Sequence, residues 1–135
     1  MSALEERPRV GLALIATWRN VAEQAATQYA AFRSHKGTCL IPVSVAGDRL
    51  LGLLAAGSGR PEAAKKHFEA ALTFCDRNGY RSEYAWSVLD YADVLIEHGE
   101  PRDHEKALAL YEQARMLASH MRMRPIRDRV ASGAP

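Results

Sequence analysis

An alanine followed four positions later by an aromatic residue recurs in three well-separated segments of the chain. The pairs are Ala25 with Tyr29, Ala64 with Phe68, and Ala107 with Tyr111. The alanines are separated by 39 and then by 43 residues. Because positions four apart lie on one face of an α-helix, we expect each pair to mark one helix of a repeated unit.

Each of these expected helices follows another one that carries a small residue near its middle. The small residues are Ala13, Gly52 and Ala92. Two antiparallel helices approach closely only where small side chains face each other, and an aromatic ring one turn later fills the space between neighbouring hairpins. A period of roughly 34–45 residues with this pattern is typical of an α-solenoid.

The chain of 135 residues, with 47% hydrophobic and 25% charged residues, has the length and composition of one globular domain. We predict an all-α fold in which three antiparallel hairpins precede a short C-terminal helix. The hairpins are expected at 8–34, 44–78 and 82–121, and the last helix at 125–131. Pro61 suits a first helical turn, and Gly79 suits a helix end. The third turn is longer, since the small residue and the alanine are 15 rather than 12 positions apart.

The connection at 34–47 is longer than a usual turn between helices. Its apolar residues are Cys39, Leu40, Ile41, Val43 and Val45. We expect an extended segment packed on the helices. A buried β-strand is the alternative, but the sequence offers no second strand to pair with it.

The repeated residues resemble those of the tetratricopeptide repeat (TPR) family. The family pattern is matched by Leu51, Gly52, Ala64, Phe68 and Ala71, and again by Tyr91, Ala92, Ala107, Tyr111 and Ala114. Residues 46–130 are also similar to the C-terminal repeat region of bacterial AAA-type ATPase regulators, LuxR-type activators and class III adenylate or guanylate cyclases. The resemblance implies a role in binding other proteins within bacterial signalling or transcriptional regulation.

The resemblance also implies where binding occurs. In TPR arrays the first helix of each hairpin lines a concave face, and carrying that register across gives Arg49, Leu53, Trp86, Leu89, Asp93 and Glu97, with Trp18 from the first hairpin. A protein or peptide segment is expected to bury an apolar side chain beside Trp86 and Leu89, while Arg49 and Asp93 select charge. For Trp86, a position in the groove and a position in the core stay open as alternatives. For Trp18, a position in the core is favoured.

The motifs tested for chemistry do not indicate an enzyme. The glycines of "GSGRPE" (57–62) lack the Lys-Ser/Thr of a phosphate-binding loop and are expected to form a turn between helices. No G-x-S-x-G motif is present, and the five histidines are expected at the surface, so we predict no cofactor and no metal. Asp93 and Glu97 lie on one helical face, where an acidic surface is favoured over a catalytic pair.

The sequence leaves two alternatives to a protein partner open. The arginines near the C-terminus, Arg115, Arg122, Arg124, Arg127 and Arg129, are opposed in that segment by Asp128 alone, which makes a nucleic acid an alternative partner. A solvated basic end is favoured, because no aromatic residues alternate with the arginines and the net charge is only +2. Self-assembly is the other alternative, since short solenoids leave apolar end faces uncovered.

The cellular location is inferred from the absence of a long apolar stretch and from the spacing of the cysteines. No apolar stretch is long enough to cross a bilayer, so we predict no membrane partner. Cys39 and Cys75 form no CxxC pair and fit a reducing compartment. We therefore expect a cytoplasmic protein.

Overall fold

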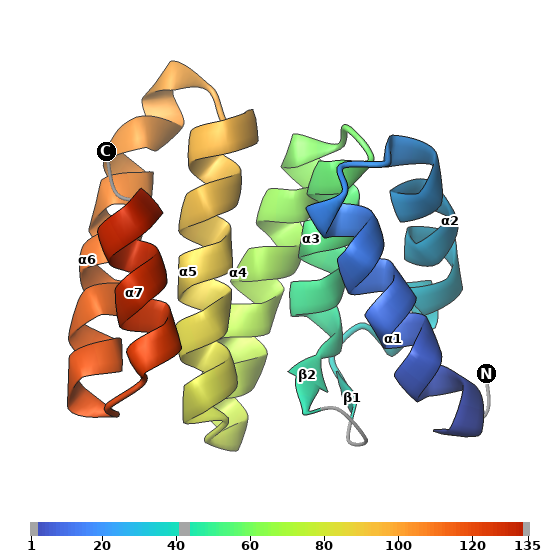
Figure 1. Cartoon of the computed structure of the whole chain (residues 1–135), viewed down its shortest axis with the longest axis horizontal. Helices are drawn as coiled ribbons and strands as arrows, with labels where there is room; N and C mark the ends of the chain where they lie inside the picture. The colour runs from blue at the N-terminus through green and yellow to red at the C-terminus, as the bar shows by residue number, and fades with distance from the viewer. Residues whose placement is uncertain (1–2, 41–43, 134–135) are drawn as a thin grey trace.

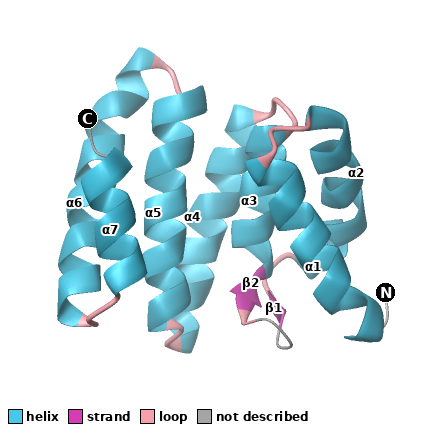
Figure 2. Ribbon diagram, in the orientation of Figure 1, coloured by secondary structure: helices cyan, strands magenta, loops and turns pink. Residues whose placement is uncertain are grey.

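The computed structural model describes residues 3–40 and 44–133, and for residues 3, 4, 6 and 7 it describes the backbone alone. Within these residues the chain forms seven α-helices and one two-stranded sheet (Figures 1 and 2). The helices are α1 (Ala3–Trp18), α2 (Ala22–Phe32), α3 (Gly47–Gly57), α4 (Pro61–Asn78), α5 (Arg81–His98), α6 (His104–His120) and α7 (Arg124–Gly133). The strands are β1 (Cys39–Leu40) and β2 (Val45–Ala46). The predicted all-α class is confirmed.

The helices follow one another across the molecule in chain order. Figure 1 shows them running from α1 and α2 at one side to α6 and α7 at the other. Each helix packs on the next along the chain, and α1 also contacts α3, α3 contacts α5, and α5 contacts α7. The odd-numbered helices therefore form one row, behind which α2, α4 and α6 pack.

The turns explain where the helices begin and end. Pro61 occupies the first turn of α4, and Gly79 ends that helix in the left-handed conformation at φ +71°. The long third turn contains a 3₁₀ helix, η2 (Pro101–Asp103), which accommodates its additional residues. The first helix begins at Ala3 rather than at 8 and includes Pro8, and the last helix extends from 124 to 133 rather than from 125 to 131.

The close approach of α3 and α4 depends on Gly52. A Cβ atom at this position would lie 2.8 Å from the Phe68 ring. The same ring stacks on Tyr91 of α5, with centroids 5.3 Å apart and planes inclined by 9°. As the sequence predicted, a small residue lets two helices meet, and the aromatic residue joins that pair to the next helix.

The segment between α2 and α3 corrects one expectation. Cys39 pairs with Ala46 and Leu40 with Val45 in an antiparallel ladder, so a partner strand does exist. It was missed because both strands, each of two residues, lie within the same short segment. Ile41, Pro42 and Val43 lie outside the described residues.

His67 corrects another expectation, because it is buried rather than at the surface, with 6% of its area exposed. Its Nε2 lies 2.9 Å from the Tyr29 hydroxyl, and its Nδ1 lies 2.9 Å from Oδ1 of Asp48. The other carboxylate oxygen of Asp48 accepts a hydrogen bond of 2.7 Å from the backbone N–H of Gly37. These contacts satisfy a polar cluster that joins α2, α3 and α4 inside the molecule.

Candidate binding groove

A groove of about 730 Å³ runs over the row of odd-numbered helices. Its walls include Leu14, Thr17 and Trp18 from α1, Arg49, Leu53 and Ala56 from α3, Trp86, Asp90, Asp93, Val94 and Glu97 from α5, and Arg129 from α7. The α5 positions follow helical spacing and form one stripe along that helix. The groove is therefore built from one face of each helix in the row.

Most of the residues predicted for the concave face meet in this groove. Arg49, Leu53, Trp86, Asp93 and Glu97 all line it. Leu89 does not, because its side chain is fully buried at 0% exposure and belongs to the hydrophobic core. A partner in the groove therefore has no access to Leu89, and the role of apolar anchor site predicted for it is wrong.

The structure places the two tryptophans differently with respect to the groove and the core. Trp18 lines the groove and is 81% exposed, so the favoured assignment to the core is wrong for this residue. Trp86 is half-buried, packs against the core cluster and also lines the groove. Its indole therefore forms part of the groove floor and contributes to packing beneath it.

A buried carboxylate connects three helices at the groove. Asp90, 2% exposed, accepts a hydrogen bond of 2.6 Å at Oδ2 from Nε of Arg49 and one of 2.7 Å at Oδ1 from Nη2 of Arg129. Arg49 also donates from Nη1 to Oε1 of Glu83 at 2.6 Å. Asp90 on α5 thus binds an arginine from α3 on one side and an arginine from α7 on the other.

Arg129 and Asp93 extend this network along α5. Nε of Arg129 lies 3.1 Å from Oδ2 of Asp93, and its Nη2 also bonds that oxygen. The other oxygen of Asp93 accepts the hydroxyl of Tyr111 from α6. Sequence analysis had grouped Arg129 with a solvated basic end. A signal for its true position was available, because the spacing of Ile126 and Val130 indicates that one face of α7 packs against the other helices. Arg129 lies next to that face.

The arginines also stack over the indole of Trp86. The guanidinium carbon of Arg49 lies 5.6 Å from the ring centroid, and that of Arg129 lies 6.0 Å from it. Both distances are within the usual range of a cation–π contact. Asp90 and Trp86 therefore hold the same two arginines in place in this part of the groove.

The network keeps both arginines charged and Tyr111 neutral. Burial alone would lower the pKa of Arg49, but Asp90 and Glu83 raise it above its ordinary value. The pKa of Arg129 is raised in the same way by Asp90 and Asp93, against the effect of burial. Burial and the carboxylate of Asp93 both raise the pKa of the Tyr111 hydroxyl. The hydroxyl therefore stays a hydrogen-bond donor at neutral pH.

Glu97 differs from the other carboxylates of the groove. Its side chain is 69% exposed, and the ion-pair contact described for it is with the imidazole of His98, at 3.6 Å. No arginine or lysine of the described residues pairs with it in the way that Arg49 and Arg129 pair with Asp90. Its negative charge therefore faces solvent at the groove wall.

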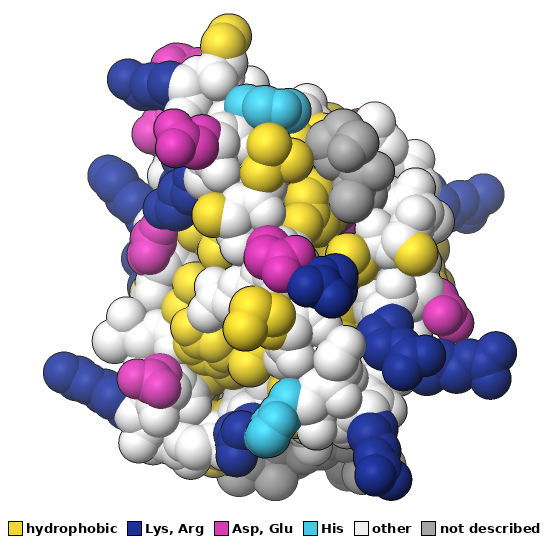
Figure 3. Space-filling view, turned by 90° about the vertical axis from the view of Figure 1, so that its left-hand side faces the viewer, with side chains coloured by type: hydrophobic (Ala, Val, Ile, Leu, Met, Phe, Trp, Pro, Cys, Tyr) yellow, Lys and Arg dark blue, Asp and Glu magenta, His cyan; other side chains and the backbone are white. Residues whose placement is uncertain are grey.

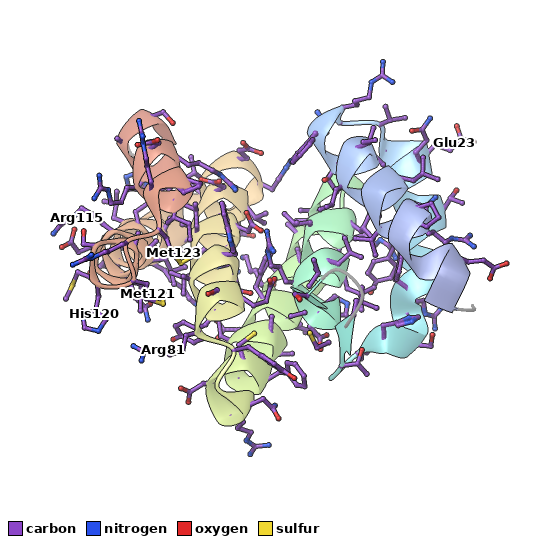
Figure 4. The ribbon with its side chains drawn as sticks, turned by 60° about the horizontal axis from the view of Figure 1, so that its bottom comes forward. Glu23, Arg81, Arg115, His120, Met121 and Met123 are labelled. Carbon is purple, nitrogen blue, oxygen red and sulfur yellow. The ribbon has the colours of Figure 1, made fainter. Side chains whose placement is uncertain are left out.

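The basic residues near the C-terminus do not act as one set. Arg115 pairs with Glu112 at 2.6 Å, Arg124 lies 3.6 Å from Asp128, and Arg129 belongs to the groove. Figure 4 shows Arg115, His120, Met121 and Met123 around the end of α6, with Arg81 toward the same side. On the α6–α7 side of the molecule, basic side chains are scattered, and several stand beside acidic ones (Figure 3). This distribution does not favour a phosphate-binding surface.

The described residues contain neither a metal-binding cluster nor a membrane-spanning helix. No group of three or more His, Cys, Asp or Glu side chains there is placed to hold a metal ion. None of the helices in the described part of the chain has the length and apolar character needed to span a membrane.

Comparison with known proteins leaves the groove as the main functional evidence. No protein-family model, no curated protein and no solved structure matches this chain.

Proposed function

We propose that the protein is a non-catalytic interaction module that binds a segment of a partner protein in the groove over α1, α3, α5 and α7. One observation carries the proposal: residues as far apart in the chain as Leu14 and Arg129 converge in one groove together with two tryptophans. Tryptophan and arginine are frequent energetic centres of protein interfaces.

The shape and fixed geometry of the groove support recognition of a chain segment. The half-buried side chains of Leu14 and Leu53 in its wall offer apolar surface that a bound side chain would remove from water. The arginines beside this wall are held by carboxylates, so binding requires little reordering of them. Passive binding of a preformed segment is the function that such a surface supports best.

We further propose that the hairpins form a TPR-like solenoid and that the module acts in bacterial signalling or regulation. The alternation of small and aromatic residues supports the first part, together with the contact of Gly52 with Phe68. The row of first helices lining one groove is the arrangement that the resemblance implies. The signalling role rests on the resemblance of residues 46–130 alone.

The direct test is selection of a phage-displayed library of random short peptides on the immobilised protein. The same library is selected on Trp18→Ala, which removes an exposed groove residue that the core does not need. Trp86→Ala is the second variant, with circular dichroism to show whether it keeps the fold. Glu23→Gln on α2 serves as a control at an exposed position that does not line the groove (Figure 4).

We expect peptides enriched on the wild type and on Glu23→Gln to bind Trp18→Ala and folded Trp86→Ala at least several-fold more weakly. Removal of an interface tryptophan often costs about 2 kcal/mol, roughly thirtyfold in affinity. Equal enrichment on wild type and on Trp18→Ala, with equal affinities, would reject the groove as the binding site.

A second candidate function is self-association, which the two end helices favour. α1 exposes Leu12 and Ile15, while α6 exposes Leu108 and Met116, and these helices lie at opposite sides of the molecule (Figure 1). Contact between the α1 side of one copy and the α6 side of another would cover both. Sedimentation velocity over rising concentration tests this candidate. A species that grows with concentration and is abolished by Ile15→Glu supports it, and a constant monomer rejects it.

A further inference from the structure

We propose that the segment bound in the groove is cationic, with a lysine or arginine placed beside an apolar or aromatic side chain. This inference rests on the proposed function and specifies the chemistry of the partner. It replaces the expectation that Arg49 and Asp93 select charge, because both of these groups already have partners inside the protein.

The two arginines of the groove are already paired with carboxylates of the protein itself. Arg49 donates to Asp90 and Glu83, each at 2.6 Å, and Arg129 donates to Asp90 and Asp93. Both guanidinium groups also lie over the indole of Trp86. A carboxylate on the partner would meet arginines whose charge Asp90, Glu83 and Asp93 already offset, and it would be repelled by those carboxylates.

The charged side chains of the groove and its surroundings carry a net negative charge. Two arginines are surrounded by the three carboxylates of Glu83, Asp90 and Asp93, and the exposed carboxylate of Glu97 adds a fourth. Because the arginines neutralise only part of this set, the groove attracts cations and repels anions. Charge complementarity of this kind selects partners and raises the rate of encounter.

Uncharged features of the groove favour the same partner. Trp18 is 81% exposed and, unlike Trp86, has no cation over its ring among the described contacts. Its indole face can therefore receive a guanidinium or ammonium group from a partner. The half-buried side chains of Leu14 and Leu53 provide an apolar surface for the neighbouring side chain of the same segment.

The test compares the composition of selected peptides and the affinities of matched ones. Peptides enriched on the wild type are expected to be rich in Lys and Arg next to apolar residues. One enriched peptide is then synthesised with a fluorescent label, alongside copies in which its basic residue is replaced by Gln or by Glu. Each copy is titrated by fluorescence anisotropy into the wild type, Glu97→Gln, Glu97→Lys and the control Glu23→Gln.

We expect the basic peptide to bind Glu97→Gln about two- to fivefold more weakly than the wild type, the usual range for one exposed ion pair. The Glu97→Lys variant should bind the basic peptide more weakly still. It should bind the Glu-containing copy more tightly than the wild type does. Glu23→Gln should leave all affinities unchanged. Raising the salt concentration should reduce the preference for the basic peptide.

The outcomes separate this inference from the proposed function. Enriched peptides that are neutral or acidic, and that bind Glu97→Gln as well as they bind the wild type, overturn the inference while the groove stands as a binding site. The absence of any peptide that distinguishes the wild type from Trp18→Ala overturns the proposed function, and the inference with it.

Discussion

Nε of Arg49 donates a hydrogen bond of 2.6 Å to Oδ2 of Asp90, and this contact joins α3 to α5 at the groove. The same carboxylate binds Arg129 of α7 through its other oxygen. A single buried side chain thus sets the relative positions of three helices that line the groove.

Asp90→Asn is therefore expected to destabilise the fold by about 3 kcal/mol, since removing one member of a buried ion pair leaves its partners poorly compensated. The loss should fall near the low end of the usual range because Glu83 still binds Arg49. Urea unfolding followed by circular dichroism measures it. Glu97→Gln on the same helix is the matched control and should change stability by no more than about 0.5 kcal/mol. Equal losses in the two variants would contradict a structural role for Asp90.

Gly52→Ala should destabilise the protein by about 1–3 kcal/mol, because the added methyl group would meet the Phe68 ring at 2.8 Å. Gly11→Ala in α1 is the control: its Cβ would have no atom within 4 Å, so better helix propensity should raise stability by up to about 1 kcal/mol. Thermal unfolding of both variants tests the pair. A Gly52→Ala protein as stable as Gly11→Ala would show that the two helices do not need this close approach.

Asp48 should make the fold sensitive to acid. Burial alone would raise its pKa, but hydrogen bonds from His67 and Gly37 lower it below the ordinary value of 3.8. A carboxyl whose pKa is lower in the folded state contributes stability above its unfolded pKa and loses it as the pH falls through the folded one. The urea midpoint should therefore fall as the pH is lowered toward about 3, and by less in Asp48→Asn. The exposed Asp76→Asn should follow the wild type. The same acid response in all three proteins would contradict this role.

The positions of helices and turns could be predicted from the sequence because they depend on local rules. Helical spacing placed Ala64 and Phe68 on one face, and Pro61 and Gly79 mark the ends of α4. The register that the TPR resemblance implies placed Arg49, Trp86 and Glu97 on a common surface, and all three line one groove in the structure. Leu89 was misplaced because it sits at the edge of the α5 stripe, where a small rotation of the helix turns a side chain into the core.

Pairings between distant residues could not be predicted in this way. Arg49 and Asp90 are 41 positions apart, and Arg129 and Asp90 are 39 apart, so no local pattern relates them. The burial of His67 had a signal that was overlooked, since this residue shares the helical face of Ala64, Phe68 and Ala71. A polar residue within such a face needs partners, and Asp48 and Tyr29 provide them.

The central claim, that the groove is the binding surface, is tested most directly by nuclear magnetic resonance of the isotope-labelled protein titrated with a peptide enriched in the selection. The largest changes in amide shift are expected along the groove faces of α3 and α5, at residues such as Leu53, Trp86 and Glu97, with a smaller set in α1 near Trp18. The side-chain indole signals of both tryptophans should shift as well. Changes confined to the outer faces of α4 and α6, with both indole signals unmoved, would contradict the account.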